Sequence, residues 1–140
     1  MTFTNSDWQE LCQGLTEVII HVAQFTATED RRNLNNAVLA LWRFGEYSMN
    51  AGLELQGHRT DRGHNMGKTA QKLHADGLLR KDYSKTVDQL ESYRRKVDYL
   101  SYNRERAVHF SRQNVLDCLA EMQELQVEME RELFKARKLR

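Results

Sequence analysis

An all-α fold, an up-and-down bundle of four long helices with one short helix inserted, is predicted for this 140-residue sequence. Apolar residues recur every three or four positions along most of the chain, which is the period of an amphipathic helix. No stretch alternates apolar and polar residues for the length of a β-strand. Proline breaks helix interiors, and the sequence contains none. Because no linker or repeat divides the chain, we expect one domain over residues 1–140.

The first helix is predicted to begin at Ser6 and to end near Phe25. Ser6 and Gln9 have the spacing of a capping box, in which each side chain bonds the backbone of the other residue. The second helix is expected to start at the sequence Thr28-Glu-Asp, which puts acids in its first turn, where the helix dipole favours them. The apolar face of the first helix consists of Trp8, Leu11, Leu15, Ile19, Val22 and Phe25 or Thr26.

The second helix carries two glycines on or beside its apolar face, Gly45 and Gly52. Each costs about 1 kcal/mol of helix propensity against alanine. We therefore expect them to admit a closely packed neighbouring helix or to mark a kink. The apolar face itself consists of Leu34, Ala37, Val38, Leu41, Trp42, Phe44, Met49 and Leu53.

Glycine and histidine gather in residues 57–67, the part of the chain most typical of a loop. A short helix is predicted from about residue 66 to 75, and Gly77 is expected to end it in the left-handed conformation. His58, His64 and His74 have the chemistry of metal ligands, but their spacing is irregular and no cysteine or carboxylate completes the set. We therefore expect no metal and no other cofactor.

The fourth helix is predicted to start near Asp82 or Ser84, and the fifth at Ser111, a preferred N-cap residue. The fifth helix and the second have more apolar positions than a small bundle buries, so a homodimer is expected. The apolar positions are Val87, Leu90, Val97 and Leu100 in the fourth helix, and Val115, Leu119, Met122, Leu125 or Gln126, Met129 and Leu133 in the fifth.

Charge and apolar content limit the classes of function. The net charge is only +1, so no global field steers the protein to nucleic acid. The longest apolar run, residues 37–42, is far too short to span a membrane, and the N-terminal sequence lacks the pattern of a signal peptide. A cytoplasmic protein without a membrane partner is expected. In that compartment Cys12 and Cys118 are expected to be small core residues, not a disulfide or a zinc site.

One local stretch is strongly basic: YRRKVDYLSYNRERAVHFSRQ, residues 93–113. It holds two arginines that are each followed, after four intervening residues, by a proton carrier, namely Arg94 with Tyr99 and Arg104 with His109. A guanidinium holds a phosphate through its planar fork of donors, and a phenol or imidazole moves a proton. These pairs therefore suit work on a phosphodiester. A solvated, salt-bridged helix end is the alternative interpretation.

The order of several short motifs resembles the HEPN family, the small helical domains named from higher-eukaryote and prokaryote nucleotide-binding proteins. The likeness is to the stand-alone prokaryotic branch and covers roughly residues 30–130. The motifs are NNAVLALWRFGEYSMNAGLEL, a loop with His64, then LHADGLLRKDYSKTVDQL, then YRRKVDY, and a last helix that opens at Ser111.

This resemblance implies a helical bundle that dimerises through its long helices. It further implies a metal-independent endoribonuclease of a toxin–antitoxin or defence system, with a nucleotidyltransferase-type antitoxin as partner and RNA as substrate. The family signature for that activity is an arginine followed a few residues later by a histidine, placed where two protomers meet. Members without the signature imply the alternative, a catalytically silent module that binds a nucleotide or a partner protein such as a nucleotidyltransferase.

Two alignments with the signature stay open. The family layout, with its spacing to Ser111, aligns Arg94 with the signature arginine and puts Tyr99 in place of the histidine. The segment RERAVH supplies the full signature as Arg104 and His109, although only two residues before Ser111. Both pairs are therefore candidate catalytic residues. The candidates for contact with RNA or a nucleotide are Arg95, Lys96, His64 and Tyr102.

Overall fold

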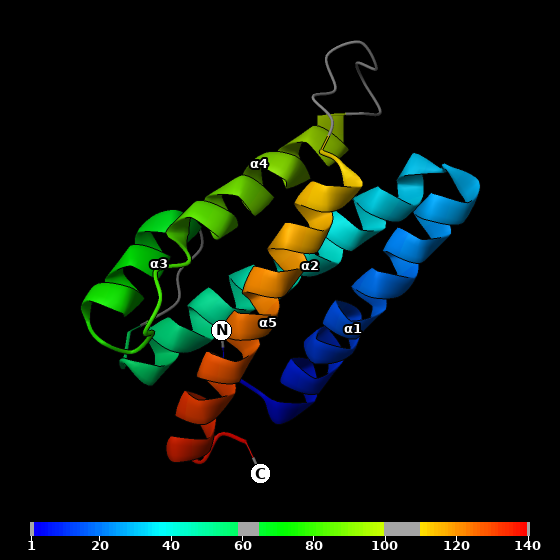
Figure 1. Cartoon of the computed structure of the whole chain (residues 1–140). Helices are drawn as coiled ribbons and strands as arrows, with labels where there is room; N and C mark the ends of the chain where they lie inside the picture. The colour runs from blue at the N-terminus through cyan, green and yellow to red at the C-terminus, as the bar shows by residue number, and fades with distance from the viewer. Residues whose placement is uncertain (1, 59–64, 100–109, 140) are drawn as a thin grey trace.

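The structure is a computed structural model that describes the backbone of residues 2–58, 65–99 and 110–139, and the side chains of the same residues except 98 and 99 (Figure 1). These residues form five helices and no strand, which confirms the predicted bundle of four long helices and one short one. The helices are α1 (Asn5–Thr28), α2 (Arg31–Leu55), α3 (Met66–Ala75), α4 (Ser84–Tyr99) and α5 (Arg112–Lys135).

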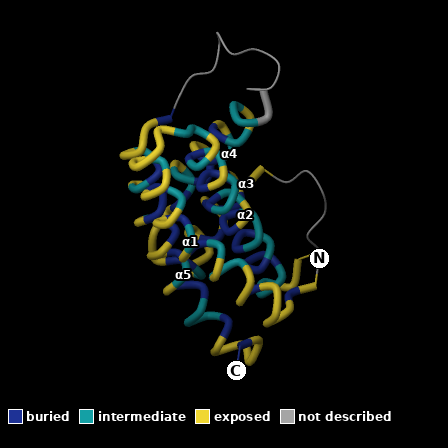
Figure 2. The backbone as a smooth tube through the Cα atoms, turned by 90° about the vertical axis from the view of Figure 1, so that its right-hand side faces the viewer, coloured by how far each residue is buried: buried dark blue, intermediate teal, exposed yellow. Residues whose placement is uncertain are grey.

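Helix α2 is the centre of the bundle, because each of the other four helices packs against it. In Figure 1, α5 lies in front of α2, with α4 on its left and α1 on its right. Helices α1 and α4 end, and α2 and α5 begin, at the same end of the bundle, which is uppermost in that view. We call this the junction end. Buried positions line the inside of the helices and exposed ones the outside (Figure 2).

Large side chains from every helix fill the interior. The rings of Trp8 and Phe44 pack with their centroids 5.3 Å apart, and both residues are fully buried. Burying a side chain of this kind contributes about 1.5–3 kcal/mol, so the core stabilises the bundle far more than any surface ion pair does. The largest fully buried side chains are Trp8, Tyr83, Phe44, Phe110, Leu34, Leu41, Met49, Leu73, Leu79, Leu90, Met122 and Leu125.

Two predicted helix starts were wrong by one or two residues. Thr4, not Ser6, caps α1, because its hydroxyl accepts a hydrogen bond from the Asp7 amide at 3.1 Å. Asp30, not Thr28, caps α2, where its carboxylate accepts from the Arg32 amide at 3.0 Å. The acids expected in the first turn of α2 therefore precede it.

Helix α1 continues to Thr28, beyond its predicted end near Phe25, whereas the remaining predicted boundaries are confirmed. Helix α3 ends at Ala75, and Gly77 follows with a φ of 81°, a conformation that costs glycine nothing. Helix α4 begins at Ser84, and the Asp82 carboxylate accepts from the Ser84 amide at 2.8 Å. Ser111 caps α5 in a reciprocal capping box with Asn114.

The apolar face predicted for α1 was wrong at one position. Ile19 is 55% exposed, and Val18 takes its place in the core. The reason is a small rotation of the helix about its own axis, since the core lies on the side of Leu15, Val18 and Val22. A period of three or four residues fixes a face only to within one position, so tertiary packing makes this choice.

The expected close approach at a glycine is confirmed for Gly52, on which we base a prediction. A Cβ at Gly52 would lie 2.5 Å from Leu73 Cδ1 of α3, whereas at Gly45 the nearest atom is 3.5 Å away and at Gly14 none lies within 4 Å. Gly52→Ala should lower the free energy of unfolding in urea by about 1–3 kcal/mol through overpacking. Gly14→Ala, the matched control, should raise it by about 0.5–1 kcal/mol. Equal responses of the two variants would contradict the close approach.

The two cysteines are free. Cys118 is buried, and burial raises the pKa of its thiol to about 12. Cys12 is half-buried, and burial together with the nearby Glu130 carboxylate also raises its pKa to about 12. Neither thiol ionises near neutral pH, so neither is a reactive nucleophile. Within the described residues, no helix combines the length and apolar character needed to cross a membrane.

Candidate functional site

Three of the predicted site residues, Arg94, Arg95 and Lys96, are described in full on the last turns of α4. Tyr99 is the last residue of α4, and only its backbone is described. The structure therefore brings the three cations together on one helix and leaves open which arginine pair is functional. The predicted residues outside the described part of the chain are His64, Tyr102, Arg104 and His109.

Arg94 is held on two sides by its own bundle. Its guanidinium lies over the indole ring of Trp42 on α2, 4.2 Å from the ring centroid. Its Nη1 lies 3.6 Å from Oε1 of Glu91, one turn earlier on α4. The other oxygen of Glu91 accepts a hydrogen bond from the Trp42 indole N–H. These three side chains, the Arg94 cluster, each contact the other two, which orients the guanidinium while the Arg94 side chain stays 36% exposed.

Arg95 and Lys96 add charge beside this cluster. Arg95 Nε lies 3.4 Å from the same Glu91 oxygen, and the Arg95 side chain is 70% exposed. The Lys96 ammonium lies 5.7 Å from the centroid of the Tyr93 ring. One carboxylate is thus shared between two guanidinium groups, so the end of α4 keeps a net positive charge.

Arg31, the first residue of α2, is a further cation at the junction end that the sequence pattern did not indicate. Its Nη2 donates a hydrogen bond of 2.6 Å to the backbone oxygen of Phe110, and its guanidinium lies 4.9 Å from the Phe110 ring centroid. Burial lowers the pKa of Arg31. Phe110 stacks in turn on Tyr93, with 5.1 Å between ring centroids. The partners are 79 residues apart, so no local sequence signal identifies this contact.

Cations from three helices therefore gather toward the junction end. Arg112 at the start of α5 joins them and donates to the Thr26 hydroxyl at 3.3 Å. Guanidinium groups and an ammonium can hold phosphate oxygens, and adjoining aromatic rings can stack on a base. We call Arg31, Arg94, Arg95, Lys96 and Arg112 the cationic end.

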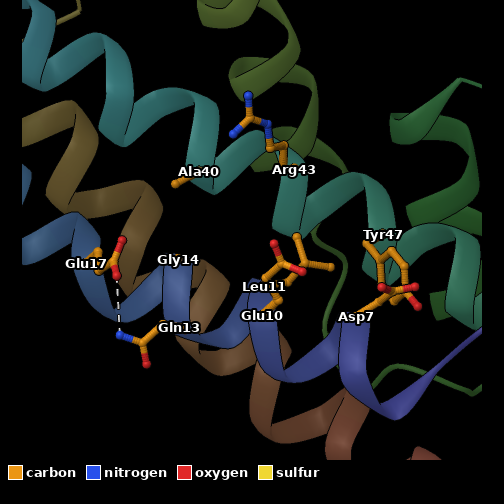
Figure 3. A pocket seen from close by; sticks show the side chains of 9 residues that line it. All are labelled: Asp7, Glu10, Leu11, Gln13, Gly14, Glu17, Ala40, Arg43 and Tyr47. Atoms are coloured by element: carbon orange, nitrogen blue, oxygen red, sulfur yellow. Dashed lines mark hydrogen bonds between the residues drawn. The ribbon is translucent and has the colours of Figure 1, made fainter.

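A separate groove of about 540 Å³ runs between α1 and α2 (Figure 3). Figure 3 shows Asp7 and Tyr47 at one end of it, Glu17 at the other, and Glu10 between them. The carboxylates outnumber the single guanidinium, from Arg43, so the groove disfavours a phosphate. It lies on the α1 side of α2, and Arg94, Arg95 and Lys96 are not among its lining residues. The lining consists of Asp7, Glu10, Leu11, Gln13, Gly14, Glu17, Ala40, Arg43 and Tyr47.

Within the described residues, no three histidine, cysteine or acidic side chains lie close enough together to bind a metal ion. Of the three histidines considered from the sequence, His74 lies with Nδ1 3.1 Å from the Leu79 carbonyl oxygen, and His64 is outside the described residues. Comparison with known proteins found no matching family model, no matching curated protein and no matching solved structure.

Proposed function

We propose that the protein is a metal-independent endoribonuclease of the HEPN kind, acting in a toxin–antitoxin or defence system. The supporting observation is the geometry of Arg94, whose guanidinium is oriented by Trp42 and Glu91 yet stays partly exposed. A guanidinium that is already ordered loses little conformational entropy when it binds a phosphate. The remaining cations of the cationic end add attraction for an RNA backbone.

The chemistry needs a fixed cation and two proton transfers. A base removes the proton from the ribose 2′-OH, and that oxygen attacks the adjacent phosphorus while the bond to the 5′ oxygen breaks. An arginine stabilises the extra negative charge on the phosphoryl oxygens, and an acid protonates the leaving oxygen. Arg94 or Arg104 fits the role of the fixed cation that stabilises the phosphoryl oxygens. A histidine ordinarily titrates at about pH 6.5 and a tyrosine at about pH 10, so His109 or His64 carries protons near neutral pH better than Tyr99 does.

The same geometry also favours a second candidate, the catalytically silent module. Contacts of Arg94 with Glu91 and Trp42 tie α4 to α2, which is a structural role that needs no substrate. A module of this kind binds a nucleotide or a partner protein, such as a nucleotidyltransferase, at its cationic end. The two candidates differ in whether the purified chain breaks RNA.

The deciding experiment incubates purified protein with RNA in EDTA at several pH values and identifies the new ends. We expect cleavage that leaves 2′,3′-cyclic phosphate and 5′-hydroxyl ends, together with growth arrest on expression. The variants Arg94→Ala and Tyr99→Ala test the first alignment with the family signature. The variants Arg104→Ala and His109→Ala test the second alignment. Arg80→Ala, which removes an exposed arginine outside the cationic end, is the matched control.

Each outcome of this experiment assigns a function. Absence of cleavage in EDTA at every pH rejects the ribonuclease and leaves the binding module. If the Arg94 and Tyr99 variants still cleave RNA and the Arg104 and His109 variants do not, the site belongs to the second alignment, that of Arg104 with His109. Equal loss in the Arg80→Ala control would show that general charge, and not the cationic end, supports activity.

A further inference from the structure

One carboxylate, that of Glu91, lies against two guanidinium groups of the cationic end. Its Oε1 is 3.6 Å from Arg94 Nη1 and 3.4 Å from Arg95 Nε. Guanidinium groups bind carboxylates and phosphates through the same N–H donors, so this oxygen stands near a position that a phosphate oxygen can take. Glu91 therefore marks a position for an anion and at the same time competes for it.

The hydrogen bond that fixes Glu91 comes from Trp42, whose indole N–H donates to the other carboxylate oxygen. Both arginine distances are longer than the upper limit of about 3.2 Å that is usual for an N–H···O hydrogen bond. Arg32 forms a tighter pair elsewhere on the surface, with bonds of 2.7–3.1 Å to the Asp30 carboxylate. The contacts of Glu91 with the two arginines are therefore loose ion pairs, and their loss costs little.

We propose that Glu91 is a charge gate on the cationic end: an RNA backbone binds there by replacing the Glu91 carboxylate at Arg94 and Arg95. The hydrogen bond from Trp42 holds the carboxylate beside the bound phosphate, where its charge continues to weaken binding. This inference rests on the proposed function in taking an RNA backbone as the ligand, but it does not require that the RNA is cleaved.

The gate favours a strand over a small anion. A single small anion exchanges one negative charge for another at the two arginines and gains little. An RNA strand carries further phosphates, which also attract other cations of the end such as Lys96, and each neutralised phosphate releases a counterion. Glu91 therefore makes binding depend on several phosphates at once, which is the regulation that this acid adds to the site.

Two substitutions separate the charge of Glu91 from its structural contact. Glu91→Gln removes the charge but keeps the side-chain length and an oxygen that can accept from the Trp42 indole N–H. Glu91→Asp keeps the charge but is one methylene shorter, which withdraws the carboxylate from Trp42. A charge gate predicts that the Gln variant changes RNA binding, whereas a purely structural role predicts that the Asp variant does.

Fluorescence anisotropy with a labelled single-stranded 2′-O-methyl RNA, in EDTA, measures the gate. The 2′-O-methyl group removes the attacking hydroxyl, so the dissociation constant is independent of cleavage. We expect Glu91→Gln to lower the dissociation constant about three- to tenfold at low salt, because one carboxylate beside the phosphate is neutralised. The gain should shrink as salt screens the charge, and Glu91→Asp should stay within about twofold of wild type.

Glu132→Gln is the matched control. Glu132 forms a similar pair with Lys135 at 3.3 Å and is 22% exposed, against 27% for Glu91, but it lies near the end of α5 that is remote from the junction end. It removes the same net charge and should leave the dissociation constant unchanged. Urea denaturation verifies that each variant stays folded.

Three results overturn the gate: unchanged or weaker binding by Glu91→Gln, an equal gain in Glu132→Gln, or no binding by either wild type or Glu91→Gln. Failure of the ribonuclease proposal is distinguishable from these results. Tighter binding by Glu91→Gln together with unmodified RNA that stays intact in the cleavage assay supports the gate and rejects the ribonuclease.

Discussion

Glu128→Ala is expected to lower the free energy of unfolding by about 2–4 kcal/mol, far more than removal of any other acid from α5. Glu128 is only 9% exposed. One carboxylate oxygen accepts a hydrogen bond of 2.6 Å from the Arg80 amide, and the other accepts from the Tyr83 hydroxyl, which is buried. Alanine leaves the buried Tyr83 hydroxyl and the partly buried Arg80 amide without this acceptor, and the loss costs the desolvation of the hydroxyl in full.

The control for this prediction is Glu124→Ala, one turn earlier on α5. Glu124 forms an ion pair with Lys81 at 2.8 Å, but its side chain is 57% exposed, so its removal should cost less than about 1 kcal/mol. Urea denaturation at pH 7 measures both variants, and a double-mutant cycle with Tyr83→Phe isolates the hydroxyl–carboxylate contact. Equal costs for Glu124→Ala and Glu128→Ala would show that burial of Glu128 contributes nothing.

The choice of neutral pH follows from the Tyr83 hydroxyl. Burial first, and then the Glu128 carboxylate, raise the pKa of Tyr83 above its ordinary value of 10.0. A group whose pKa is raised in the folded state stabilises the fold fully below its unfolded pKa and loses that contribution as the pH rises above it. The stabilisation is therefore complete at pH 7 and declines only above about pH 10.

Arg94→Ala is expected to lower RNA cleavage at least about a hundredfold if the proposed ribonuclease uses this arginine, the size typical of a lost oxyanion-type contact. Trp42, which touches no substrate in this proposal, is a positioning residue. Trp42→Leu removes the ring under the guanidinium and should lower kcat about tenfold, whereas Trp42→Phe keeps a ring face and should retain most of the activity.

This prediction separates positioning from folding. Trp42→Leu and Trp42→Phe both remove the indole N–H that bonds Glu91, so a purely structural effect of that bond would lower activity equally in both. Steady-state kinetics supply kcat and KM, and urea denaturation of the same samples supplies stability. A Phe variant as inactive as the Leu variant would contradict the stacking role of residue 42.

Local sequence signals identified the helices well because their causes are local. Gly77 ends α3 through its own backbone freedom, and Ser111 caps α5 through hydrogen bonds to Asn114, three residues away. The two wrong starts, at Ser6 and Thr28, arose where several cap-forming residues stand side by side. There the choice of Thr4 and Asp30 depends on how the chain enters from outside the helix.

Contacts between distant residues could not be predicted in the same way. Pattern alone assigned Ile19 to the core and gave no role to Glu128, yet the fold exposes the first and buries the second between α5 and the start of α4. Arg31 likewise acquires its place at the cationic end from Phe110. Of the predicted site, the sequence supplied the arginines of α4, and the structure supplied the partners that orient Arg94.

The sequence by itself therefore determined that this chain is a helical bundle, where α3, α4 and α5 begin, and that its basic residues concentrate near the end of α4. Periodicity and capping act within one or two turns of the chain, so one sequence is enough to identify them. Only the tertiary structure decided the rotation of each helix. That rotation stacks Arg94 on Trp42, buries Glu128, and leaves Ile19, Val127 and Phe134 facing solvent. The physical reason is that a helix presents every side chain outward, and packing against its neighbours selects which of them the core covers.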